Sequence, residues 1–152
     1  MRRRIVVWLL VAAPAAAPGV YAGEAPGDCR AEQTQAGLNA CAGAGFAQAD
    51  AELNRVWRAI VAKYADQPLF LARLKTAQRA WLAFRDTELG ARFPLAPGQQ
   101  AGVQYGSAFP MCESQQKARL TEQRTAQLRA WLDGVEEGDV CSGSIKHKDT
   151  LQ

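Results

Sequence analysis

The sequence predicts an all-α domain: a disulfide-stapled helical hairpin with a third packed helix and a long Gly/Pro-rich loop. Apolar residues recur at intervals of three and four in three stretches, and no stretch alternates with the two-residue period of a strand. The chain also has four cysteines in 152 residues, enough for two disulfides in one small domain. With 48% hydrophobic and 22% charged residues, it has the composition of an ordinary globular protein.

The first 22 residues have the organisation of a secretory signal peptide. Three arginines at 2–4 precede an apolar run at 5–13, and small residues at Val20 and Ala22 suit signal peptidase. A transmembrane anchor is the alternative, but the apolar run is short for a span and Pro14 and Pro18 interrupt it. We therefore expect cleavage after Ala22 and a periplasmic or secreted protein.

The excess of positive charge in the sequence comes from the arginines of this signal. The full sequence has 18 Lys and Arg residues against 15 Asp and Glu residues. Removing residues 1–22 removes three arginines and no acid, so the remaining protein has no net charge. Without the signal, the sequence has no basic patch of the kind that would indicate nucleic-acid binding. The residues before Cys29 are not those of a lipoprotein signal, so no membrane anchor is expected after cleavage.

The first helix is predicted over residues 34–65, where Thr34 is a candidate N-cap. Gly37, Gly43 and Gly45 weaken its first part and make a break near 41–45 plausible. Its apolar stripe consists of Phe46, Ala49, Leu53, Val56, Trp57, Ile60 and Tyr64.

The second helix is predicted over residues 68–91, with Pro68 in its first turn. One face combines apolar and polar side chains: Leu71, Leu74, Gln78, Trp81 and Arg85. The next stretch, 90–111, is rich in Gly and Pro and has no helical period, so a long loop is expected.

The third helix is predicted over residues 112–133, with Gly134 as its stop. Residues 135–152 are polar apart from Cys141 and are expected to form a loose C-terminal tail. The domain organisation is therefore a signal peptide at 1–22, a helical domain at 23–134 and a tail at 135–152.

The four cysteines are Cys29, Cys41, Cys112 and Cys141. An even number in an exported small domain indicates disulfides, and three pairings are possible. A metal site is not expected, because there is no C-x-x-C and the single histidine, His147, lies in the polar tail.

No catalytic constellation is present in the sequence. His147 stands between two lysines in the tail, and there is no nucleophile elbow, P-loop or zinc-protease motif. Paired carboxylates at glycosidase spacing are not apparent either. We therefore expect no enzyme activity and no cofactor.

A set of polar residues on the predicted helices is more informative. If the first two helices form an antiparallel hairpin, Arg85 has the donor geometry to pair with Asp50. The favoured interpretation is a structural network that fixes helix register, and the alternative is a ligand site. The residues are Asp50, Asn54, Gln78, Trp81, Arg85 and Arg124.

These segments together resemble the N-terminal domain of the LprI-type lysozyme inhibitors, a family of small exported bacterial domains. The matching pieces span most of the mature chain: 28–29, 34–35, 38–42, Phe46, Asp50, 53–54, Tyr64, 74–81, 84–88, Cys112 and 120–128. The resemblance implies a helical domain without cofactor or reaction, and inhibition of a muramidase as its activity.

The sequence departs from the family at one cysteine. The family usually has a cysteine after the Arg-Asp-x-Glu segment, where this chain has Leu89. Cys29 and Cys41 remain the natural local pair, which leaves Cys112 for Cys141. A pairing of Cys112 with Cys29 or Cys41 is the alternative, because a helix of about 30 Å would separate Cys112 from Cys141.

The proposed contact with a muramidase lies in the 90–111 loop, where Phe93, Tyr105 and Phe109 are candidate apolar anchors. The alternative is that these aromatic side chains pack back onto the helices. A second hypothesis for the whole protein is a non-catalytic cell-envelope module that binds a different protein or a cell-wall component.

Overall fold

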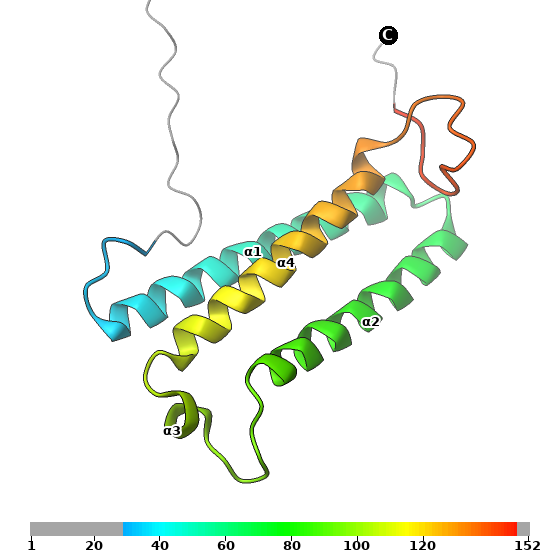
Figure 1. The fold of residues 1–152 in the computed structure, drawn as a ribbon. Helices are drawn as coiled ribbons and strands as arrows, with labels where there is room; N and C mark the ends of the chain where they lie inside the picture. The colour runs from blue at the N-terminus through cyan, green and yellow to red at the C-terminus, as the bar shows by residue number, and fades with distance from the viewer. Residues whose placement is uncertain (1–28, 149–152) are drawn as a thin grey trace, which may run out of the picture.

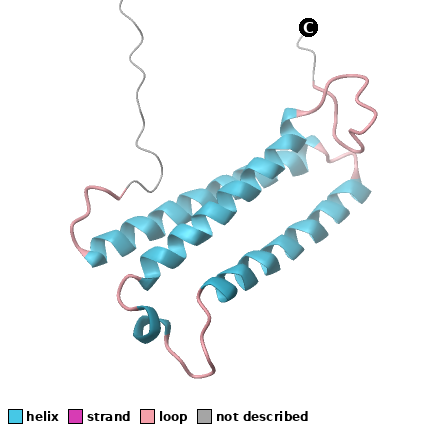
Figure 2. Ribbon diagram, viewed as in Figure 1, coloured by secondary structure: helices cyan, strands magenta, loops and turns pink. Residues whose placement is uncertain are grey.

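The computed structural model describes residues 29–148, so the signal peptide predicted at 1–22 lies outside the described residues. It contains four helices: α1 (Gln35–Lys63), α2 (Pro68–Arg92), α3 (Ala101–Tyr105) and α4 (Phe109–Asp133) (Figures 1 and 2). The described residues form no strand, only an isolated bridge between Val135 and His147. The prediction of an all-α protein is confirmed.

The central unit is a parallel pair made of α1 and α4, and α2 runs antiparallel beside it (Figure 1). The buried stripe of α1 contains small residues at Ala42, Gly45 and Ala49, which let the α4 backbone approach closely. The side chains that form the core cluster are Leu53, Val56, Ile60, Tyr64, Leu74 and Leu128.

The prediction that the first two helices pack against each other as a hairpin is therefore wrong. In the structure α1 packs mainly against α4, and α2 makes fewer contacts, mostly with α4. Only Leu74 and Leu89 of α2 are buried, and Leu82 and Phe84 are exposed. Periodicity identified the buried face of each helix but not its partner.

The sequence signals at the helix ends are confirmed. The Thr34 hydroxyl accepts a hydrogen bond from the Gly37 amide at 3.0 Å, which caps α1. Pro68 occupies the first turn of α2. Gly134 ends α4 at φ 72°, and a Cβ there would lie 2.8 Å from the Lys146 carbonyl oxygen. The helix α1 continues without a break through Gly43.

The segment after α4 folds back against the ends of α1 and α4. Backbone hydrogen bonds join Val135 to Lys146 and Lys148, and the Lys146 ammonium binds Asp66 at 2.8 Å. The Tyr64 hydroxyl accepts a hydrogen bond from the Lys146 amide at 3.0 Å. Residues 134–148 are thus a docked segment rather than the loose tail expected from their polarity.

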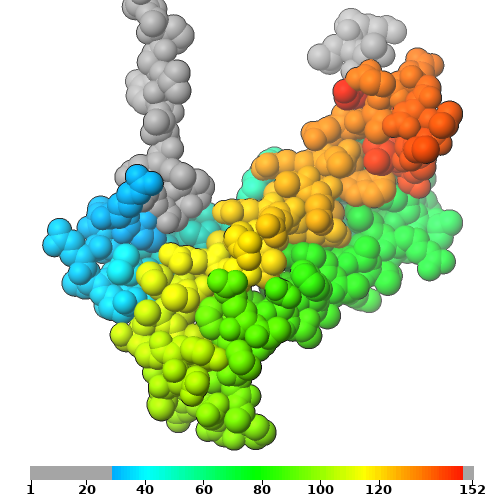
Figure 3. Space-filling view, in the orientation of Figure 1, coloured from blue at the N-terminus to red at the C-terminus, as the bar shows by residue number. Residues whose placement is uncertain are grey.

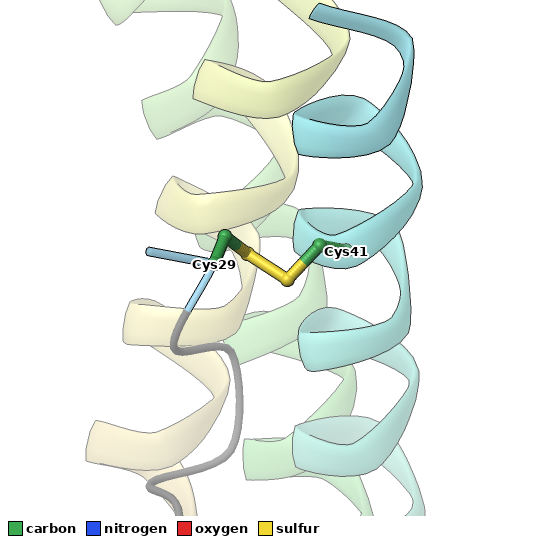
Figure 4. Close-up of a disulfide and its surroundings, with 2 residues drawn as sticks. All are labelled: Cys29 and Cys41. Atoms are coloured by element: carbon green, nitrogen blue, oxygen red, sulfur yellow. A yellow bond between two sulfur atoms is a disulfide. The ribbon is translucent and has the colours of Figure 1, made fainter. Parts of the chain in front are cut away.

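One disulfide joins Cys29 to Cys41, with 5.8 Å between the two Cα atoms (Figure 4). It fixes the segment before α1 onto the second turn of that helix. Cys112 and Cys141 are free thiols, so the expected Cys112–Cys141 bridge is wrong. Cys112 lies in the first turn of α4 and Cys141 beyond its last turn, and a 25-residue helix is about 37 Å long.

Candidate functional site

The segment between α2 and α4, residues 93–108, projects from one end of the helical body (Figure 3). Three partly buried aromatic rings hold its base. Phe93 meets Tyr105 and Phe109 edge to face, with centroids 5.6 and 5.4 Å apart, and Tyr105 stacks on Phe109 at 5.7 Å. The Tyr105 hydroxyl donates to the Pro94 carbonyl oxygen at 2.6 Å. The structure thus brings the three predicted anchors together, packed against one another.

The short helix α3 lies inside the predicted 90–111 loop, between glycines at φ 82° (Gly98) and φ 73° (Gly106). These backbone angles favour glycine, which allows the chain to reverse direction within a few residues. The Asn39 amide donates to the Ser107 carbonyl oxygen at 3.0 Å and ties the segment to α1. The projection is therefore anchored at both its base and its side.

Two aliphatic side chains are exposed on this projection. Leu95 is 42% and Val103 83% exposed, so these two side chains face solvent more fully than the half-buried aromatic rings do. Sequence reasoning missed both because it singled out the aromatic residues. The sequence did offer one indication: each is an isolated aliphatic residue among Gly, Gln and Pro, where no apolar stripe would bury it.

A hollow of about 510 Å³ lies beside the aromatic rings, between α2 and α4. Its wall combines apolar rings with charges of both signs. Glu113 and Lys117 pair across one helical turn at 2.9 Å, and the Lys117 ammonium lies 6.0 Å from the centre of the Phe46 ring. The lining residues are Phe46, Arg85, Asp86, Leu89, Gly90, Phe93, Leu95, Phe109, Glu113 and Lys117.

The predicted polar network is divided into separate contacts. Asp50 accepts from the Asn54 amide at 2.9 Å within α1. The Arg85 guanidinium binds Asp86 at 3.0 Å and lies 5.5 Å from the centre of the Trp81 ring. The expected Arg85–Asp50 pair is absent because α1 packs against α4 rather than α2. These four residues and Asp86 therefore form no common site.

The remaining two members of the network do meet across helices. Arg124 on α4 donates to the Gln78 side-chain oxygen on α2 at 2.9 Å and to Gln127 at 3.1 Å. Partial burial lowers the pKa of Arg124 from its usual value. This contact is one of the links that attach α2 to the α1–α4 pair.

An ion pair that sequence reasoning missed joins α1 to α4. Glu52 accepts hydrogen bonds from Arg55 in its own helix and from Arg129 on α4. The hydrogen bonds from Arg55 and then Arg129 lower the Glu52 pKa from 4.5 to about 2. No local pattern identifies Arg129 as the partner, because it lies 77 positions later.

A second hollow, of about 660 Å³, lies at the opposite end of α2 and is mainly apolar. Phe70 and Leu74 of α2 face Trp131 of α4 there, with the two aromatic ring centroids 4.7 Å apart. Leu69 is exposed at its edge. Pro68 and Leu74 of the predicted second helix line this hollow, but it includes none of the candidate site residues predicted from the sequence.

Within residues 29–148, no group of three or more His, Cys, Asp or Glu side chains is arranged to hold a metal ion. His147 lies within 3.3 Å of the Glu136 carbonyl oxygen. None of the described helices is long and apolar enough to span a membrane.

Sequence comparison supplies the family. The sequence profile of the lysozyme inhibitor LprI family matches residues 27–128, which include α1, α2, α3 and most of α4. The chain belongs to the LprI family. The family is described by the name of a lysozyme inhibitor, and the match covers the aromatic base and the projection of residues 93–108.

Among curated proteins, this chain is 38% identical over 120 residues to the uncharacterized protein R02472 of Rhizobium meliloti (strain 1021). The alignment covers 72% of this chain and 81% of the relative. No solved structure matches this chain significantly.

Proposed function

We propose that this LprI-family protein is exported, binds a muramidase and blocks its cleft with the projection formed by residues 93–108. The observation that carries this proposal is the exposed apolar surface of Leu95 and Val103 on a projection braced by three aromatic rings. A substrate cleft is concave, so a convex and rigid apolar element fits it better than a flat helical face does.

The rigidity of the projection favours tight binding. The aromatic rings, the Tyr105–Pro94 hydrogen bond and the Asn39–Ser107 hydrogen bond restrict the segment before it meets a partner. A preorganised segment loses less conformational entropy on binding than a disordered loop. The accessible edges of Phe93, Tyr105 and Phe109 extend the proposed contact toward the base.

The proposed compartment agrees with the chemistry of the chain. A disulfide such as Cys29–Cys41 persists in an oxidising environment, and residues 1–22 have the pattern of an export signal. The protein without this signal has no net charge, so apolar contact rather than charge attraction supplies the affinity. Inhibition is therefore expected to change little between low and moderate salt.

The test is a lysis assay in which residues 23–152 are titrated against several lysozyme types on peptidoglycan. Wild type is expected to protect near stoichiometry, and Val103→Glu to weaken protection at least tenfold. Val140→Glu is the matched control, because Val140 is 97% exposed and lies beyond the opposite end of α4.

Equal inhibition by wild type and Val103→Glu would contradict the proposed contact. A folded wild type that protects nothing at large molar excess would contradict the inhibitor function. That outcome would favour the alternative, an envelope module with another protein or cell-wall partner and no catalytic activity.

A further inference from the structure

We propose that a small hollow between the end of α2 and the first half of α4 binds a compact oxyanion, a carboxylate or phosphate group. The hollow has a volume of about 280 Å³, and no acidic residue lines it. Its lining residues are Arg92, Phe93, Cys112, Gln115, Gln116 and Arg119. The two arginines come from different helices, so an anion between them would join α2 to α4.

Gln116 supplies the strongest indication of a missing ligand. It is only 5% exposed, and its Nε2 has no hydrogen-bond partner. Its Oε1 accepts from Arg119 Nε at 3.2 Å and Arg119 Nη2 at 2.9 Å. Because arginine has donors only, this contact fixes the orientation of the amide and leaves Nε2 as an unsatisfied buried donor. Gln116 lines the hollow, and an oxyanion that drew Arg119 away from Oε1 would let the amide turn and donate Nε2 to it.

Within the described part of the chain, no carboxylate neutralises the positive charge at the hollow. Arg55, Arg85 and Arg129 each pair with a carboxylate. Within residues 29–148, neither Arg92 nor Arg119 does so: Arg92 lies 6.0 Å from the Phe93 ring centre and Arg119 binds Gln116. Unpaired guanidinium groups are the donors that carboxylate and phosphate groups prefer.

This site is separate from the proposed muramidase contact, although Phe93 borders both. Its ring lines the hollow and belongs to the aromatic base of the projection. An anion bound here would hold the end of α2 against α4 and so brace residues 93–108. The inference does not depend on the muramidase being the partner.

Cys112 lines the hollow and provides the readout. In a Cys141→Ser protein with the Cys29–Cys41 disulfide intact, Cys112 is the only thiol left. We expect inorganic phosphate, compared with sodium chloride at equal ionic strength, to slow alkylation of Cys112 by iodoacetamide at least threefold. Acetate is the second probe, and the ratio of the two effects shows whether the site prefers phosphate or carboxylate.

Matched variants assign the effect to the site. Arg92→Gln and Arg119→Gln change exposed side chains, are expected to fold, and should abolish the protection. Arg79→Gln, exposed on α2, should retain it. Gln116→Met removes the unsatisfied donor together with the Oε1 acceptor of Arg119, so it should weaken the anion effect.

Two results would overturn the proposal. One is an alkylation rate that neither phosphate nor acetate changes in the protein with both arginines. The other is protection of the same size in Arg92→Gln, Arg119→Gln and Arg79→Gln, which would indicate a general salt effect.

Discussion

Replacing Tyr64 with phenylalanine should loosen the docked C-terminal segment while leaving the core packed. The Tyr64 side chain is fully buried, and its hydroxyl donates to the Trp131 carbonyl oxygen at 2.9 Å. The same hydroxyl accepts from the Lys146 amide at 3.0 Å. One oxygen atom therefore connects the end of α1, the end of α4 and the 134–148 segment.

The cost of Tyr64→Phe follows from these two hydrogen bonds. The ring keeps its contacts with Phe70 and Trp131, whose centroids lie 4.5 and 6.2 Å away, so little apolar burial is lost. Each lost bond costs about 1 kcal/mol, and a partly buried group left unpaired adds to that. We expect the free energy of unfolding to fall by about 2–3 kcal/mol.

The assay is urea unfolding of residues 23–152 with the disulfide intact, followed by circular dichroism. Tyr105→Phe is the control, because it loses a single exposed hydrogen bond to Pro94 and should cost about 1 kcal/mol or less. Tyr64→Phe should also speed tryptic cleavage after Lys146 and Lys148. A loss below about 0.5 kcal/mol, or one equal to that of Tyr105→Phe, would refute the reasoning.

Three further predictions concern the helical body. Replacing Cys29 and Cys41 together by serine should lower the free energy of unfolding by about 3 kcal/mol in the same urea assay, since the bridge closes a short loop. Leu128→Ala should cost about 3 kcal/mol because Leu128 is fully buried in the core, and a near-zero loss would contradict that packing. The Glu52 pKa is lowered to about 2, so ionised Glu52 stabilises the fold above pH 4.5 and this contribution disappears as pH falls toward 2. Glu52→Gln should flatten that part of the pH–stability curve, measured by thermal unfolding.

The helices could be predicted because their signals are local. Predicted spans of 34–65, 68–91 and 112–133 correspond to Gln35–Lys63, Pro68–Arg92 and Phe109–Asp133. The Thr34 cap, Pro68 and Gly134 set boundaries through contacts within a few residues. Such contacts are encoded by adjacent residue types.

The choice of helix partners could not be predicted from periodicity. A repeating apolar stripe shows which face of α1 is buried, but α2 and α4 both offer a face to meet it. The small residues Ala42, Gly45 and Ala49 were the available indication that a helix approaches α1 closely. The Arg85–Asp50 prediction failed because it assumed the other neighbour.

The candidate site was predicted in part. Its location between the second and third long helices and its three aromatic residues came from composition alone. The mutual packing of those rings, the exposure of Val103 and the docking of Lys146 onto Tyr64 depend on contacts between distant residues. The last of these spans 82 positions, which no local pattern reveals.

Competition for the muramidase cleft tests the central claim most directly. Binding of residues 23–152 to a lysozyme would be measured by calorimetry with and without a saturating N-acetylglucosamine oligomer in the cleft. Occlusion predicts that the oligomer multiplies the apparent Kd by one plus the ratio of its free concentration to its own Kd, and that Val103→Glu weakens binding while Val140→Glu does not. Binding of unchanged affinity in the presence of the oligomer would contradict occlusion by the 93–108 projection.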